Sequence, residues 1–111
     1  MKLSKIDINF IDCDLDEKNE LNTLLPSFKA VLTSDYDYLN EYIKTKYVYK
    51  NTTLQTSLML ACYLKDLKAV EILLNKEIGY VDLYDNSALY YAKCSKDDNI
   101  IKLIEKYEFV N

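Results

Sequence analysis

The apolar residues of segment 56–74 fall into two groups, each with the spacing of one helix face. The first group is Leu58, Leu60, Ala61 and Cys62, and the second is Ala69, Val70, Leu73 and Leu74. Thr56 and Asp66 stand just before these groups, where a side-chain oxygen can accept hydrogen bonds from the free N–H groups of a first helical turn. The segment therefore predicts two short helices folded back on each other, which need a partner of the same kind to bury their apolar faces.

The same pattern recurs at a fixed interval along the chain. Ser87 follows Thr56 at an offset of 31 (87 − 56 = 31), and Asp97 follows Asp66 at the same offset (97 − 66 = 31). One interval earlier there is a degenerate copy, in which Asp35 again precedes the second group of apolar residues. We therefore expect a tandem array of about three helix pairs.

Segments 56–61 (TSLMLA) and 87–92 (SALYYA) are similar to T-P-L-H-x-A, the first-helix pattern of the ankyrin repeat family. Segment 70–74 (VEILL) resembles the V-x-x-L-L core of the family's second helix, and segment 77–82 (EIGYVD) resembles the turn that joins two units. The resemblance covers roughly residues 20–111 and implies an all-α fold, an ankyrin-repeat-like solenoid of stacked helix-turn-helix units. The implied repeats are about 20–50, 51–81 and 82–111.

The chain contains no histidine, which is its main departure from that family. Positions 65–66 and 96–97 are Lys-Asp where the family has Gly-His, so the family's threonine–histidine hydrogen bond is absent. Without histidine a nucleophilic cysteine lacks its usual base, and Cys62 reads as a small buried hydrophobe. No Gly-rich phosphate loop, recognisable carboxylate pair or Cys/His metal set is present. We expect no enzyme activity, no cofactor, no metal site and no small-molecule substrate.

The composition is that of one small helical domain. A chain of 111 residues that is 50% hydrophobic can bury a modest core, and a single Gly and a single Pro suit helices joined by short loops. No segment approaches the roughly 18 apolar residues of a membrane span, and the first ten residues lack the apolar core of an export signal. Cys13, Cys62 and Cys94 have no metal-type spacing, so we expect reduced thiols in a cytoplasmic, intracellular protein.

The charged residues argue against a nucleic-acid partner. The net charge is −4, and all 14 basic residues are lysines. Recognition of phosphates and base edges favours arginine, and general binding to nucleic acid needs a basic patch. We therefore expect no direct contact with nucleic acid. The lack of a long apolar segment likewise leads us to expect no membrane partner.

Residues 1–22 do not follow the repeating pattern. Segment 6–10 alternates apolar and polar residues, as a half-buried strand does. Segment 12–20 is acidic and begins Asp-x-Asp-x-Asp like a calcium loop, but Glu17 and Thr23 stand where an EF-hand needs Gly and Glu. An acidic helix start or a solvated loop is the favoured interpretation, with a calcium-responsive module as a third functional hypothesis. Residues 1–19 are thus expected to form an N-terminal extension, a capping strand or loop, before a repeat domain at 20–111.

The ankyrin resemblance implies that partners bind at the turn tips and inner-helix ends, on the concave side. Position by position, it assigns partner binding to Thr52, Thr53, Gln55, Tyr63, Leu64, Leu83, Tyr84, Asn86, Cys94 and Ser95. Four of these residues, at positions 63, 64, 83 and 84, are large and apolar where exposure is expected, which is typical of an interface. The alternative is that Leu64 and Leu83 pack into neighbouring repeats or against the N-terminal segment.

Two functional hypotheses follow from this pattern. The first is a non-catalytic protein–protein interaction module, which binds another protein through the concave face of a short stack. The second is a permanent small structural or accessory subunit of a larger intracellular assembly.

Overall fold

The computed structural model describes residues 25–108, and within them it contains six helices and no strand. The helices are α2 (Pro26–Leu32), α3 (Tyr36–Tyr42), α4 (Ser57–Tyr63), α5 (Leu67–Glu77), α6 (Ala88–Ser95) and α7 (Asp98–Glu108). The all-helical prediction is confirmed for this part of the chain. The expected strand at 6–10 and the acidic segment at 12–20 lie outside the described residues.

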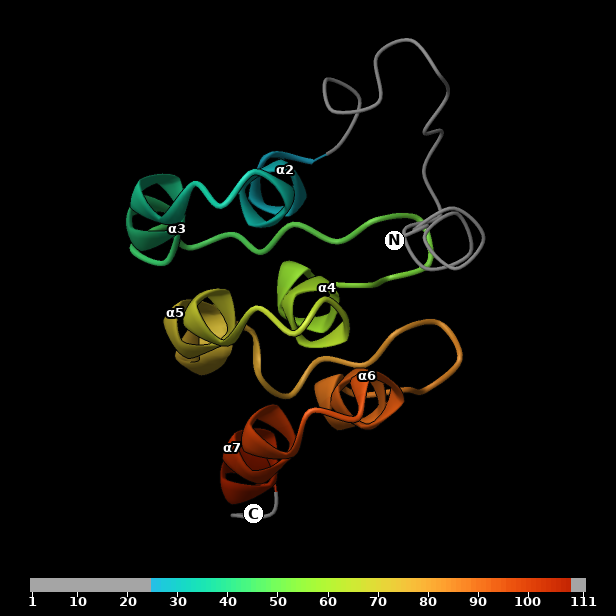
Figure 1. The fold of residues 1–111 in the computed structure, drawn as a ribbon. Coiled ribbons are helices and arrows are strands. Elements are labelled where there is room, and N and C mark those ends of the chain that lie inside the picture. Colours follow the sequence, from blue (N-terminus) through green and yellow to red (C-terminus); the bar gives the residue numbers. More distant parts are fainter. Residues whose placement is uncertain (1–24, 109–111) are drawn as a thin grey trace, which may run out of the picture.

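The helices form three pairs, α2 with α3, α4 with α5 and α6 with α7. Figure 1 shows α2, α4 and α6 in one column and α3, α5 and α7 in another. Within each column, each helix packs on the equivalent helix of the neighbouring pair. The pairs are therefore stacked, and each buries its apolar face against the next.

The interval found in the sequence reappears in the positions of the helices. Helices α2, α4 and α6 begin at residues 26, 57 and 88, and helices α3, α5 and α7 begin at residues 36, 67 and 98. Each pair turns through one residue with a left-handed backbone, and these residues, Ser34, Lys65 and Lys96, keep the same spacing. Equivalent residues in the three pairs therefore share a backbone conformation as well as a position.

Most of these helices begin at a side-chain N-cap, at the residues that the sequence pattern predicts. Asp35, Thr56 and Asp66 each accept a hydrogen bond from the backbone N–H three residues later. Asp97 accepts the same bond at the start of α7. Ser87 precedes α6 without a capping bond from its hydroxyl. Satisfying these N–H groups stabilises a short helix by about 1 kcal/mol per cap.

The column formed by α2, α4 and α6 packs closely because small residues lie at its centre. Ala30, Ala61 and Ala92 occupy equivalent positions in α2, α4 and α6, and all three are buried. Cys62 adjoins this line and is fully buried, and burial raises the pKa of its thiol to about 12. Its role is therefore to fill the core, as expected, and its thiol is inert at neutral pH.

One carboxylate lies inside the core, between the first and second pairs. Glu77, at the end of α5, is 1% exposed. It accepts hydrogen bonds from the Tyr42 hydroxyl, from the Ser57 hydroxyl at 2.9 Å and from the Leu58 N–H at 2.7 Å. Tyr42 belongs to α3, whereas the other two donors lie in the first turn of α4. This one side chain therefore ties α5 to both α3 and α4.

Replacing Glu77 tests this arrangement and its dependence on pH. Glu77→Ala leaves the O–H groups of two buried hydroxyls and a buried N–H without their acceptor, which costs about 3 kcal/mol of unfolding free energy. Glu77→Gln retains acceptor and donor groups and costs about 1 kcal/mol or less. Chemical denaturation of both variants and the parent protein measures these differences.

The pH dependence has a definite sign, because burial raises the pKa of Glu77 although its hydrogen bonds and the Lys76 charge oppose the shift. The stability that this carboxyl contributes is full below its unfolded pKa of about 4.3 and declines as pH rises toward the folded pKa. The unfolding free energy of Glu77→Gln should thus rise relative to that of the parent protein between pH 4 and pH 7. A constant difference over this range would contradict the raised pKa.

Lys65 provides a test of the repeated left-handed turn. Its φ is 63°, a conformation that costs a side chain about 1 kcal/mol and costs glycine nothing. We expect Lys65→Gly to raise the unfolding free energy by about 0.5–1 kcal/mol. Lys102→Gly, in the middle of α7, is the matched control and should lower it by about 1 kcal/mol. Equal losses in the two variants would refute the assigned turn.

Candidate functional site

Two long connections, 43–56 and 78–87, run to the same side of the stack in Figure 1. Each contains a tight turn built on one side chain, Asn51 in the first and Asp82 in the second, at equivalent positions of the two repeats. In both, Oδ1 accepts from the backbone N–H groups two and four residues later, at distances between 2.8 and 3.1 Å. The two turns therefore have the same internal structure and present their tips alike.

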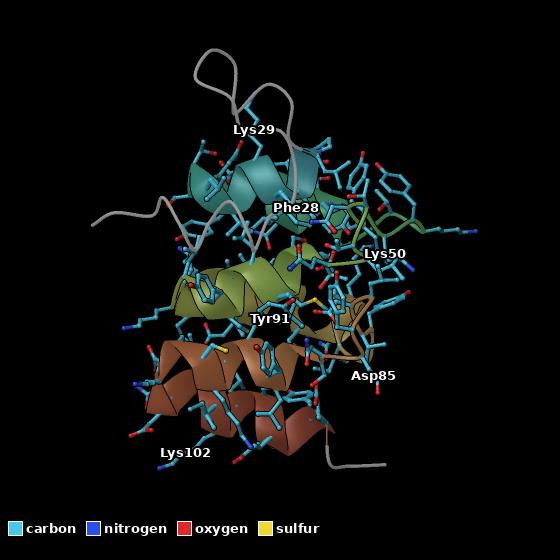
Figure 2. The ribbon with its side chains drawn as sticks, turned by 90° about the vertical axis from the view of Figure 1, so that its right-hand side faces the viewer. Phe28, Lys29, Lys50, Asp85, Tyr91 and Lys102 are labelled. Atoms are coloured by element: carbon cyan, nitrogen blue, oxygen red, sulfur yellow. The ribbon has the colours of Figure 1, made fainter. Side chains whose placement is uncertain are left out.

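Hydrogen bonds also join the second turn to the first. The Leu83 N–H donates to the Thr53 carbonyl at 2.8 Å. The Tyr91 hydroxyl, on α6, donates to Asp82 Oδ2 and accepts from Gln55 Nε2 at 2.9 Å. Figure 2 shows Tyr91 between the ribbons of α4 and α6. Its hydroxyl therefore fastens the tip of the last repeat to both α6 and the preceding turn.

The charge of Asp82 strengthens this attachment. Burial alone would raise the pKa of Asp82, but hydrogen bonds from Tyr91, Asn86 and Tyr84 outweigh it and leave the pKa below its usual range. Burial and the neighbouring Asp82 raise the pKa of Tyr91, which keeps its hydroxyl protonated as a donor. An ionised acceptor paired with a neutral hydroxyl makes a short, strong hydrogen bond.

The residues expected to bind a partner lie in three different environments. Thr52, Leu83, Tyr84 and Cys94 are exposed, and Thr53, Tyr63, Leu64 and Asn86 are half-buried. Gln55 and Ser95 are buried, with exposed fractions of 5% and 7%.

The burial of Gln55 and Ser95 corrects the sequence-based list. Gln55 points inward to the Tyr91 hydroxyl. The Ser95 hydroxyl donates to the Ala92 carbonyl at 2.6 Å and accepts from the Asp97 N–H at 3.3 Å, where α6 turns into α7. Both side chains stabilise the turns around them and offer no surface to a partner.

The alternative for Leu64 and Leu83 is now resolved separately for each residue. Leu64 is half-buried and packs against the core, as the alternative had it. Leu83 is 56% exposed, and its neighbour Tyr84 is 71% exposed. We call Leu54, Leu83 and Tyr84 the tip surface, because all three are exposed apolar side chains on the connected turns.

Several residues of this region were missed from the sequence. Leu54 is 42% exposed, with a left-handed φ of 62°, and Asp85 has a left-handed backbone at the equivalent position of the next repeat. Asp82 could have been found from the sequence, because it lies one repeat interval after Asn51 and both residue types form turns. Tyr90, 48% exposed on α6, had no such signal, because the equivalent Met59 is buried.

The described part of the chain offers little other chemistry. Between residues 25 and 108 no group of three or more His, Cys, Asp or Glu side chains could hold a metal ion. None of the helices in this range is long and apolar enough to cross a bilayer. Lys50 and Asp85 place one charge of each sign on the side of the connections (Figure 2).

No protein-family model, curated protein or solved structure matches the chain.

Asp82→Asn tests how the tip is held. Asparagine supports the same turn at position 51, so this variant should keep the backbone and lose only the charge-assisted hydrogen bonds. At pH 7 we expect an unfolding free energy about 1–2 kcal/mol below that of the parent protein.

The difference between Asp82→Asn and the parent should depend on pH. Because the folded pKa is lowered, the contribution of Asp82 is present above its unfolded pKa of about 3.9 and is lost as pH falls through the folded value. Denaturation curves from pH 6 to pH 3 should therefore converge for the two proteins. Curves that stay parallel would show that the charge does not stabilise the turn.

Proposed function

We propose that the chain is a short ankyrin-like stack and acts as a non-catalytic protein–protein interaction module. Support for the ankyrin-like arrangement comes from three stacked helix pairs at a constant interval, with both long connections on one side. Such stacks share a fold and differ in target, so the surface and not the fold must identify the partner.

The observation that carries this proposal is the exposure of Leu83 and Tyr84 on an ordered turn. Their backbone is held by bonds to the Asp82 carboxylate and to the Thr53 carbonyl. A partner that covers these side chains would bury apolar area without first ordering the backbone, and that ordering is a major cost of binding. Tyrosine is also among the residue types that contribute most at interfaces.

A permanent subunit of a larger intracellular assembly is the second form of the same proposal. It would use the same tip surface, but the complex would not exchange its partner. The two forms differ in dissociation rate and in the solubility of the isolated chain.

A pull-down from native extract tests the proposal with the double variant Leu83→Ser/Tyr84→Ala. The tip surface loses its two most exposed apolar side chains, so a specific partner captured by the parent protein should bind at least 10-fold more weakly, a loss of about 1.4 kcal/mol or more. Quantitative mass spectrometry of the captured proteins measures this ratio, and circular dichroism confirms that the variant stays folded.

The control is Leu67→Ser/Tyr47→Ala, which removes the same two residue types from other exposed positions. It should retain the partner. Equal loss in both variants, or retention of every partner by the tip variant, would overturn the proposed interface. A partner that stays bound through extended washing would favour the permanent-subunit form.

A further inference from the structure

A pocket of about 400 Å³ opens where the start of the α5–α6 connection meets the end of α7. Its lining residues are Ile78, Gly79, Val81, Ser87, Tyr107 and Glu108. A Cβ added at Gly79 would meet no atom within 4 Å, so this wall is open. Val81 and Tyr107 are about two-fifths exposed, at 42% and 40%. The wall therefore combines apolar and polar surface in similar amounts, and a carboxylate and a hydroxyl are among its polar groups.

Both polar groups lack part of their expected hydrogen bonding. Glu108 Oε2 is a buried oxygen with no hydrogen-bond partner. Ser87 is the N-cap residue of α6, but its hydroxyl makes no capping bond. A buried carboxylate oxygen without a donor is unfavourable, because it has lost water and gained nothing in exchange.

Comparison with the preceding repeat shows what this site lacks. Glu108 occupies the position in the last repeat that Glu77 occupies in the middle one, where two hydroxyls and an N–H hold the carboxylate. The two hydroxyl donors have no counterpart around Glu108, because the positions one interval after Tyr42 and Ser57 are Leu73, in α5, and Ala88, in α6. The last repeat has thus kept the acceptor and lost two of its donors.

We propose that this pocket binds the cationic end of a lysine or arginine side chain from a partner protein. An ammonium or guanidinium group in the pocket would donate a charge-assisted hydrogen bond to the Glu108 carboxylate, which lines it. The aliphatic stem of such a side chain fits against Ile78 and Val81, and the ring of Tyr107 can take part in a cation–π contact. The source of the side chain rests on the proposed function, whereas the preference for a cation rests on the pocket alone.

An NMR titration with blocked tripeptides tests the preference for a cation. The probes are acetyl-Ala-Lys-Ala-amide and acetyl-Ala-Arg-Ala-amide, and the control contains norleucine, which has an apolar side chain of similar length to lysine. At constant ionic strength, the cationic peptides should shift the backbone amides of residues 78–81, 87 and 107–108 saturably, with dissociation constants of roughly 1–10 mM. The norleucine peptide should cause no saturable shift.

Glu108→Gln and Glu105→Gln are matched variants, since each removes one negative charge from α7. We expect Glu108→Gln to weaken binding of the cationic peptides at least 5-fold, and Glu105→Gln to change it less than 2-fold. Equal weakening in both variants would assign the effect to net charge and overturn the site. Saturable binding of norleucine, or no saturable shift with either cationic peptide, would overturn it as well.

The result also separates this inference from the proposed function. If peptide binding depends on Glu108 but Leu83→Ser/Tyr84→Ala captures the partner as well as the parent protein does, the cation site is supported and the tip surface is refuted. If Leu83→Ser/Tyr84→Ala loses the partner but neither cationic peptide binds the parent protein, the tip surface is supported and the cation site is refuted.

Discussion

The stack depends on a carboxylate buried between two helix pairs. Glu77 is accessible to almost no water, and the Tyr42 hydroxyl reaches it from the preceding repeat. A second tyrosine–carboxylate bond, from Tyr36 to Asp66 at 3.1 Å, joins the same two repeats farther along. In a chain without arginine or histidine, tyrosine is a donor that reaches a buried acid without adding a charge. Tyrosine is therefore a structural element of the repeat junctions here.

The helix pairs were predictable from the sequence because their determinants are local. A cap, a small residue and an apolar face recur in each repeat, and each acts within a few residues of where it stands. The exposure of individual side chains was not predictable in the same way. Gln55 turns inward because Tyr91, far along the chain, offers it an acceptor, and Leu83 stays outside although it has the same apolar character as Leu64.

Asp82 and Glu77 show how surroundings decide what an acid does in this fold. Both are buried and both accept several hydrogen bonds, yet the pKa of Glu77 is raised and that of Asp82 is lowered. For Glu77 the cost of leaving water dominates, whereas for Asp82 the bonds from a turn backbone and a tyrosine prevail. A fall in pH therefore weakens the turn that Asp82 holds, whereas a rise in pH weakens the contribution of Glu77 to the junction between the first and second helix pairs.

The last repeat combines an ordered turn with a carboxylate that lacks the hydroxyl donors of its counterpart in the middle repeat. Its turn is fixed by Asp82, so the exposure of Leu83 and Tyr84 is a property of an ordered surface and not of fraying. Its Glu108 keeps the position of Glu77 but not the hydroxyl donors. Among the described residues Glu108 Oε2 has no hydrogen-bond donor, and the proposed partner side chain would bring a cationic donor to this carboxylate.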